Sequence, residues 1–367
     1  MESPTVVIDN GSGFCRSGFA GSDQPKSIIK TIAAIPILQG KKQDNLCLLS
    51  DSYSSTMGMA IDKRRPISHG IITDWEAMEI LWNHIFVCKL KVFPEDQPVL
   101  MTDSPSSPST NREKMAEVLF EAFAVPGLQI ANTALLTLCS YGLISGLVIE
   151  AGAGVSYTAV VCEGEVLKQA TYRLDIAGRS LTKHLTKLLL EANNFPLNLE
   201  KKVVTRIKQT CCYVSLDFEK DVNSNKQELA NFDLPDGQHL TLGRERFTCP
   251  EPFFRPQMLG HDSPGIHLLA MSSIQKVPAE FRAEVVGHIV FSGGSSMFPG
   301  FPERIRHELL KISPEDYHYR FLASPERSEA TWAGGSIIAS LQSSKPMMMT
   351  MKDYQEYGAF HVYEKFG

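Results

Sequence analysis

Several features that would assign a protein to a particular class are missing from this sequence. No apolar run approaches the roughly 18 residues that a membrane span needs. The N-terminal residues Met1–Pro4 lack the basic region and apolar core of a signal peptide. The 36 basic and 41 acidic residues give a net charge of −5 and form no block of like charge, which argues against a dedicated nucleic-acid groove.

Cysteine motifs, linkers and the Walker phosphate-binding pattern are also absent. The eight cysteines are scattered without a Cys-x-x-Cys pair or metal-ligand spacing, and the adjacent Cys211 and Cys212 suit free thiols. This usage predicts a reducing compartment, the cytosol or the nucleus. With 367 residues, 43% of them hydrophobic, the chain is too long for one small core, so two tightly coupled lobes are expected.

What the sequence does contain is a duplicated strand-to-glycine motif. An apolar run ends at Asp9 and is followed by the turn Gly11-Ser12-Gly13 and a second apolar stretch. Later in the chain, another apolar run ends at Glu150 and is followed by Gly152-Ala153-Gly154. A repeat of this spacing predicts a duplicated α/β domain, with one copy in each lobe.

Local patterns predict several further elements. Helices are expected over Asp74–Trp82, from Asn111 onward and over Lys202–Cys212, because apolar residues recur there at helical spacing. Pro235-Asp236-Gly237 predicts a turn. The polar stretch Gln39–Asn45 predicts a mobile surface loop.

The glycine turns have a chemical interpretation. Glycine lets backbone N–H groups approach a phosphate chain closely, so two facing hairpins could grip a polyphosphate from both sides. The acids Asp9 and Glu150, each at a strand end, could hold a metal ion through water. Ser292-Gly293-Gly294-Ser295 supplies a third turn of this kind. One hairpin is weak support because such turns are common, whereas the duplicated pair is much stronger.

These segments resemble the actin family. The first glycine turn, 9–21, is similar to the first phosphate loop of actin, and the similarity runs in register from about Val6 to Lys365. Further matching segments are Pro66–Trp75, Asn111–Met115, Cys212–Val214, Leu234–Gly237, Ser292–Ser295, Pro325–Arg327 and Trp332–Ser336. This is more specific than the fold that sugar kinases, Hsp70 chaperones and actin share.

The resemblance implies an α/β fold, the duplicated actin-like ATPase fold, with ATP between two lobes that are each built on a five-stranded sheet. The first lobe would comprise residues 1–132 and 334–367, with an inserted subdomain at about 31–66. The second would comprise 133–333, with an insertion at about 177–264.

The resemblance also implies a set of nucleotide contacts, with ATP or ADP and Mg²⁺ as the ligand. Arg16 stands where the family has a phosphate-contacting lysine, and Gln209 stands where a glutamate holds the ribose, so weaker binding than in conventional actin is expected. The implied contact residues are Gly11, Ser12, Gly13, Phe14, Arg16, Gly152, Ala153, Gly154, Val155, Gly178, Lys208, Gln209, Gly293, Gly294, Ser295 and Met297. Asp9 and Glu150 are the implied metal residues, acting through water.

Departures from the family pattern concentrate where hydrolysis occurs. Thr133 replaces the glutamine that positions the attacking water, Tyr157 replaces its neighbouring histidine, and Ala153 replaces an aspartate. Glu150 keeps an acid on a longer arm. Each change alone could be neutral drift, but four at one site favour relaxed catalysis, because aligned proton acceptors are typically worth about 10²–10⁴ in rate.

Surface segments depart as well. The loop that docks into the next subunit in an actin filament is here Lys41–Asn45, which is charged and polar, and His261 replaces an apolar residue in a second contact loop. These changes argue against self-assembly, although loops also vary freely. By contrast, the partner groove implied by Tyr141, Ile337, Ile338 and Leu341 keeps its apolar character. Of Met347-Met348-Met349, at least one is expected in the core.

The sequence therefore predicts a divergent actin-related protein that acts as a nucleotide-stabilised structural or scaffolding component of a cytoskeletal assembly, with weak or absent ATP hydrolysis. The alternatives are an active, filament-forming ATPase and a small-molecule kinase of the same fold. The expected partners are proteins, including actin or actin-binding proteins, and not nucleic acid or membrane. The expected location is the cytoplasmic cytoskeleton, with the nucleus as an alternative, and a layout like that of testis-type actin-like proteins.

Overall fold

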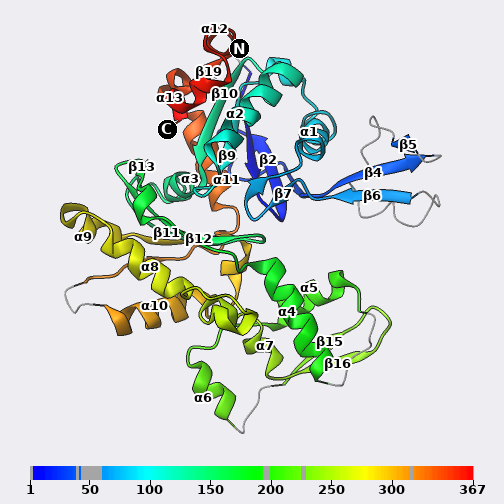
Figure 1. Ribbon diagram of the computed structural model, residues 1–367, viewed down its shortest axis with the longest axis vertical. Coiled ribbons are helices and arrows are strands. Elements are labelled where there is room, and N and C mark those ends of the chain that lie inside the picture. Colours follow the sequence, from blue (N-terminus) through cyan, green and yellow to red (C-terminus); the bar gives the residue numbers. More distant parts are fainter. Residues whose placement is uncertain are drawn as a thin grey trace. The chain divides into compact units, whose positions relative to one another are not determined.

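The computed structural model describes residues 3–38, 41–42, 60–192, 199–224, 229–313 and 317–366 (Figure 1). The chain divides into two compact units, one formed by Met1–Ile144 with Glu329–Gly367 and the other by Ser145–Ser328. Within the described ranges, no helix is long and apolar enough to cross a membrane.

The first unit is built on a mixed sheet with the strand order β19-β10-β9-β1-β2-β3 in the described residues. Its central strand β1 pairs in antiparallel fashion with β2 and in parallel fashion with β9. Smaller sheets follow β3 along the chain. The strands are β1 (Val6–Asn10), β2 (Phe14–Phe19), β3 (Ser27–Lys30), β4 (Ala33–Leu38), β5 (Lys41–Lys42), β6 (Ala60–Arg64), β7 (Ile67–Ser68), β8 (Ile71–Ile72), β9 (Val99–Asp103), β10 (Gly127–Asn132) and β19 (Met349–Thr350).

Helices from both ends of the chain cover this sheet. One face packs on a core that includes Trp82 and Phe86, both fully buried. On a second, smaller core, α11 crosses α3 so closely that a Cβ on Gly334 would lie 1.7 Å from the Leu136 carbonyl oxygen. The helices are α1 (Trp75–His84), η2 (Ile85–Leu90), η3 (Pro94–Asp96), α2 (Ser109–Glu117), η4 (Val118–Ala122), α3 (Thr133–Cys139), α11 (Ala330–Ser340), η9 (Gln342–Met347), α12 (Met351–Tyr357), η10 (Ala359–His361) and α13 (Val362–Phe366).

The second unit repeats this plan. Its sheet runs β13-β12-β11-β17-β18, with β14 also paired to β12. Strand β11 is antiparallel to β12 and parallel to β17, as β1 is to β2 and β9. The strands are β11 (Gly146–Ala151), β12 (Ser156–Cys162), β13 (Glu165–Val166), β14 (Tyr172–Leu174), β15 (Ala230–Asp233), β16 (His239–Leu242), β17 (Ile289–Ser292) and β18 (Phe321–Leu322).

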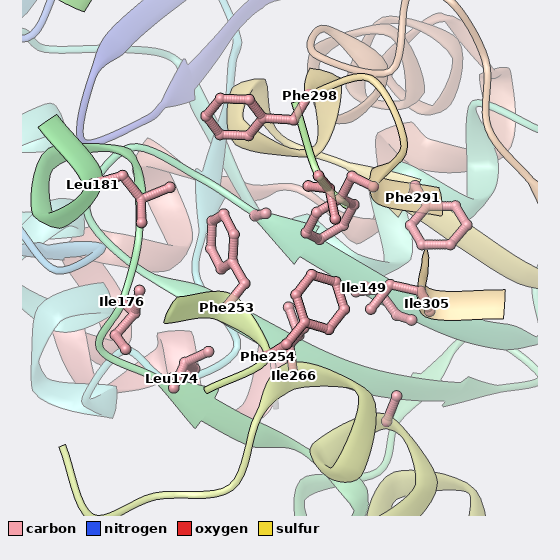
Figure 2. Packing of buried hydrophobic residues seen from close by; sticks show 14 of the residues in the cluster. Ile149, Leu174, Ile176, Leu181, Phe253, Phe254, Ile266, Phe291, Phe298 and Ile305 are labelled. Atoms are coloured by element: carbon pink, nitrogen blue, oxygen red, sulfur yellow. The ribbon is translucent and has the colours of Figure 1, made fainter. Parts of the chain in front are cut away.

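An aromatic-rich core fills the second unit (Figure 2). Phe301 meets Phe253 edge-on, with ring centroids 5.4 Å apart, and also approaches Phe291 at 6.2 Å. The helices around this core are η5 (Lys168–Ala170), α4 (Gly178–Glu191), α5 (Lys201–Cys211), α6 (Phe218–Asn223), α7 (Glu245–Thr248), η6 (Glu251–Phe253), η7 (Pro256–Leu259), α8 (Ile266–Gln275), α9 (Ala279–Gly287), η8 (Gly294–Met297) and α10 (Phe301–Ile312).

Most of the predicted local elements are present. Helix α1 begins at Trp75, within the predicted range Asp74–Trp82, and Asp74 caps it by accepting from the Ala77 N–H at 3.0 Å. The second helix begins at Ser109, two residues before the predicted start at Asn111. Gly237, at φ +85°, closes the predicted turn between β15 and β16. Met349 is fully buried in β19 and Met348 is also buried, whereas Met347 is exposed, so the expectation of at least one core methionine is confirmed.

Three expectations need a different description. The resemblance implies five strands in each lobe, whereas each main sheet has six in the described residues, because short strands such as β19 and β13 extend the edges. Within the predicted loop Gln39–Asn45, Lys41–Lys42 form the short strand β5 against β4, and the other residues lie outside the described ranges. Helix α3, which the sequence assigned to the second lobe, belongs to the first unit, since the division falls after Ile144.

Candidate functional site

The carboxylate at the end of the first strand is held on both of its oxygens. Asp9 is the cross-strand partner of Arg16 in the β1–β2 hairpin, and the Arg16 Nη1 lies 3.2 Å from Asp9 Oδ2. On the other side, Thr102 of β9 donates its hydroxyl to Asp9 Oδ1 at 3.1 Å. Asp9 is only 6% exposed, and this burial raises its pKa, against the opposing effects of Arg16 and Thr102.

The glycine turn after Asp9 is fixed by hydrogen bonds from several elements. The Thr31 hydroxyl donates to the Gly11 carbonyl at 2.5 Å, and Ser12 accepts from the Gly70 N–H at 2.9 Å. A Cβ on Gly11 would lie 2.6 Å from the Phe14 carbonyl oxygen, so this position accepts only glycine without rearrangement. The turn is therefore preorganised.

The second hairpin places its own acid in the same register. Glu150 is the cross-strand partner of Tyr157 in β11–β12 and the parallel partner of Ser292 in β17. The Tyr157 hydroxyl donates to Glu150 Oε2, and the Ser292 hydroxyl lies 3.4 Å from the same oxygen. Tyr157 is 1% exposed, so its ring is part of the core.

Both units therefore contain the same three-part arrangement, which we call the acid clamp. In each, a strand-end acid is held by the cross-strand residue of its glycine hairpin and by a hydroxyl from the parallel neighbour. The clamp is Asp9–Arg16–Thr102 in the first unit and Glu150–Tyr157–Ser292 in the second. Sequence reasoning missed Thr102 and Ser292, because only the pairing of β1 with β9 and of β11 with β17 brings them to the acids.

A second cluster of predicted residues forms around Gly178, at the start of α4. The Lys208 Nζ donates to the Gly178 carbonyl at 2.6 Å, and the Ser295 hydroxyl donates to the Gly152 carbonyl at 2.7 Å. A Cβ on Gly178 would lie 2.7 Å from Ser295 Oγ and 3.3 Å from Lys208 Nζ. Burial lowers the pKa of Lys208. The structure thus brings together four predicted residues from four separate segments.

The turn after β17 requires glycine at its first position. Gly293 has φ +84°, and a Cβ there would lie 2.4 Å from the Ala151 carbonyl oxygen and 3.1 Å from Glu150 Cγ. Next to it, Gly294 has open space around its Cβ direction. Only the first of the two glycines is demanded by the local packing.

The remaining predicted nucleotide residues lie at or near these turns in their own units. Phe14 and Met297 are partly exposed, at 39% and 38%, and Gln209 is exposed on α5. Val155 and Gly154 are buried in the second hairpin turn, and Gly13 is half-buried in the first. The predicted set therefore forms one group in each unit.

A family model for actin matches residues 1–367, the whole chain. The chain belongs to the actin family. Its mixed sheets with flanking helices agree with the actin-like ATPase fold. Proteins of this fold generally bind a nucleotide with a divalent cation, and the family is associated with the cytoskeleton.

The residues for which the resemblance predicts a place in the hydrolytic site are Thr133, Tyr157 and Ala153. Thr133 is the first residue of α3 in the first unit, after the N-cap Asn132, which accepts from the Ala134 N–H at 2.9 Å. Tyr157 and Ala153 belong to the second hairpin. The buried Tyr157 directs its hydroxyl to Glu150, so that oxygen already has a partner.

Only some of the residues expected to line the partner groove are exposed at the surface. Ile337 and Leu341 are exposed, at 44% and 46%, whereas Ile338 packs against the small core around Trp332 and Leu136. Tyr141 is half-buried just after α3. Ile337 and Leu341 are therefore the residues that a partner could contact.

The fold implies a nucleotide phosphate and a divalent cation, and the side chains near the glycine turns fit these two groups differently. The Arg16 Nε is buried and has no hydrogen-bond partner, and such an orphaned cationic donor fits a phosphate oxygen. The fit to a metal is poor, because Asp9 is already paired with a guanidinium and Glu150 with a phenol. Among the described residues, no group of three or more His, Cys, Asp or Glu is placed to hold a metal ion.

Proposed function

We propose that this protein is a nucleotide-stabilised structural or scaffolding subunit of a cytoskeletal assembly, with weak or absent ATP hydrolysis. The observation that carries the proposal is the pair of acid clamps beside intact glycine turns. The turns supply backbone donors for phosphates. The clamps engage the carboxylates that hydrolysis would need to organise metal and water.

The reduced hydrolysis follows from the second clamp. An attacking water needs a proton acceptor within hydrogen-bond reach. Tyr157 is a buried phenol committed to Glu150, Ala153 has no polar side-chain atom, and the hydroxyl of Thr133 sits on a short side chain. None of the three is a good acceptor for a water proton.

A phosphate-release assay tests this part of the proposal. The wild type should release phosphate far more slowly than conventional actin in filaments, and the triple variant Thr133→Gln, Tyr157→His, Ala153→Asp should release it faster than wild type. Nucleotide binding of both proteins serves as the control. A wild type that matches conventional actin would favour the first alternative, an active polymerising ATPase.

Nucleotide binding itself is tested by thermal unfolding. A ligand that binds only the folded state stabilises it by RT ln(1 + [L]/Kd), about 2.7 kcal/mol at 100-fold saturation. We expect the melting temperature to rise with millimolar ATP or ADP. The absence of any rise, in protein that carries no nucleotide through purification, contradicts the proposal. Transfer of phosphate from ATP to a sugar or other small molecule would instead favour the second alternative, a small-molecule kinase of the same fold.

The structural role rests on the surface. Exposed Ile337 and Leu341 form an apolar site that suits an amphipathic partner helix. The charged segment that begins with Lys41 and Lys42 disfavours burial against a second copy, because each unpaired polar group costs about 1–3 kcal/mol. We therefore propose a monomer that binds a scaffold partner or an actin-binding-type helix in the cytoplasm.

Sedimentation with ATP, followed by electron microscopy of the pellet, tests the assembly state, and long filaments would overturn this part. For partner binding, Leu341→Asp should abolish the interaction while leaving the melting temperature within about 2 °C of wild type. Ile338→Asp is less suitable for this purpose, because that side chain packs against the small core and an aspartate there would also destabilise the unit.

A further inference from the structure

The two acid clamps have a consequence for the ligand itself. In the first, both oxygens of Asp9 accept hydrogen bonds, one from Thr102 at 3.1 Å and one from Arg16 at 3.2 Å. In the second, Glu150 accepts from Tyr157. Both acids are thus engaged by side chains of their own unit.

This engagement disfavours a divalent cation. Magnesium requires near-octahedral oxygen coordination, keeps several waters, and is usually bound through one or two carboxylates together with substrate phosphates. The Arg16 guanidinium places a positive charge within hydrogen-bond distance of Asp9, where a cation held by that carboxylate would be repelled.

The same guanidinium favours an anion. Its Nε–H is buried and unpaired, whereas its Nη1 is bonded to Asp9, so the group has an unused donor next to the first glycine turn. A Cβ on Gly11 would come within 3.8 Å of Arg16 Nη1, which places the guanidinium beside the turn backbone. A planar guanidinium with several fixed donors matches phosphate oxygens well.

We propose that this chain binds its nucleoside di- or triphosphate as the metal-free anion, with the Arg16 guanidinium, and not a divalent cation, beside the phosphates. The inference rests on the proposed nucleotide binding and deepens it. It concerns only the charge balance of the ligand and not its hydrolysis.

Calorimetric titration of the full chain with ATP, in millimolar EDTA and in millimolar free Mg²⁺, tests the proposal. We expect the two dissociation constants to agree within about threefold. A loss of tenfold or more in EDTA, about 1.4 kcal/mol, would overturn the inference while leaving the proposed function standing. No binding in either buffer would overturn both.

A variant separates the guanidinium from other causes. Arg16→Met should weaken binding in EDTA by at least tenfold, and free Mg²⁺ should restore part of the loss, because Asp9 is released from its cation. The matched control is Arg112→Met, which breaks another buried Arg–Asp pair of the first unit, with Asp103 at 2.7 Å and similar exposure. The control should bind ATP in EDTA as wild type does. Unchanged binding of Arg16→Met in EDTA contradicts the proposal.

A measurement on wild type avoids any failure of the variant to fold. Mn²⁺ alone, followed by the electron paramagnetic resonance signal of the free ion, should show no site of micromolar affinity on the nucleotide-free protein. A micromolar site that Asp9→Asn removes would show that Asp9 is open to a cation and would overturn the inference.

Discussion

The two units hold the acid near the end of their central strand with different chemical groups. Each has an acid near the end of its central strand, beside a glycine turn, and each holds that acid by the hairpin partner and by the parallel neighbour; Asp9 is buried and Glu150 is half-buried. In the first unit the hairpin partner is a cation, Arg16, whereas in the second it is a neutral phenol, Tyr157. The strand pairing around the acid is therefore duplicated, but the charge of the residue that faces the acid across the hairpin is not.

A further difference lies one residue after the clamp hydroxyl. In the first unit this residue is Asp103, a buried acid whose Oδ2 pairs with Arg112 Nε at 2.7 Å. In the second it is Gly293, which has no room for a side chain. The first unit thus uses the position for an ion pair that also reaches the C-terminal segment, since Arg112 donates to the Phe366 carbonyl. The second uses it for a close turn.

The largest effect is expected where the second unit demands glycine. Gly293→Ala should destabilise the protein by about 3 kcal/mol or more, because it combines a positive φ with a backbone clash. Gly294→Ala is the matched control and should change the stability by no more than about 0.5 kcal/mol, since its surroundings are open. Urea unfolding of both variants measures this. Equal effects would mean that the turn is not fixed as described.

The acid clamp of the first unit, in which Arg16 holds Asp9, should make the free energy of unfolding depend on pH. Arg16→Met removes the partner of a buried carboxylate and should cost about 3 kcal/mol at pH 7. The loss of the guanidinium raises the folded-state pKa of Asp9 further above its unfolded value. Stability linked to a raised pKa is complete below the unfolded pKa and is lost as pH rises through the folded one.

The difference in stability between Arg16→Met and wild type should therefore shrink as the pH falls below the raised folded-state pKa of Asp9, because Asp9 is then protonated in the folded form of both proteins. Urea unfolding between pH 4 and pH 8, at about half-unit steps, follows this trend. A difference that stays constant across the range would mean that Arg16 acts through packing and not through its charge.

The two hydroxyls that reach the acids from the parallel strands, those of Thr102 and Ser292, should contribute differently to the stability of the protein. Thr102→Val leaves both Asp9 Oδ1 and the Asn10 N–H, which donates to Thr102 Oγ1 at 2.8 Å, without that partner. We expect a cost of about 2 kcal/mol. Ser292→Ala removes only a contact of 3.4 Å and should cost less than about 1 kcal/mol. Chemical denaturation ranks the two, and the reverse order would contradict the clamp geometry.

The smallest loss of stability is expected in the acid clamp of the second unit, where the hairpin partner of Glu150 is the neutral phenol of Tyr157. Tyr157→Phe keeps the buried ring and removes only the hydroxyl that donates to Glu150, so a cost of about 1 kcal/mol is expected. Tyr319→Phe is a suitable control, because it loses a hydroxyl bonded to Ser313 at 2.7 Å elsewhere in the same unit. If Tyr157→Phe cost as much as Arg16→Met at pH 7, the contrast between the two units would fail.

The local elements and the duplication could be predicted from the sequence because their signals are local. The apolar runs before Asp9 and Glu150, the glycines that follow them and the cap at Asp74 each act within a few residues. The glycine turns could be predicted in the same way. Helix α3 was assigned to the wrong side of the unit division because its place depends on the packing of Leu136 beneath Gly334, far along the chain.

By itself, the sequence determined the family, the paired glycine turns and the acid at each strand end. Only the tertiary structure decided what holds each acid. Thr102 is 93 residues from Asp9, and Ser292 is 142 residues from Glu150, so no local pattern connects them. The cross-strand register likewise decided that Arg16 faces Asp9 and that Tyr157 faces Glu150. Hydrogen bonds and charge pairing depend on distances in space, and those are set by the order of strands in a sheet.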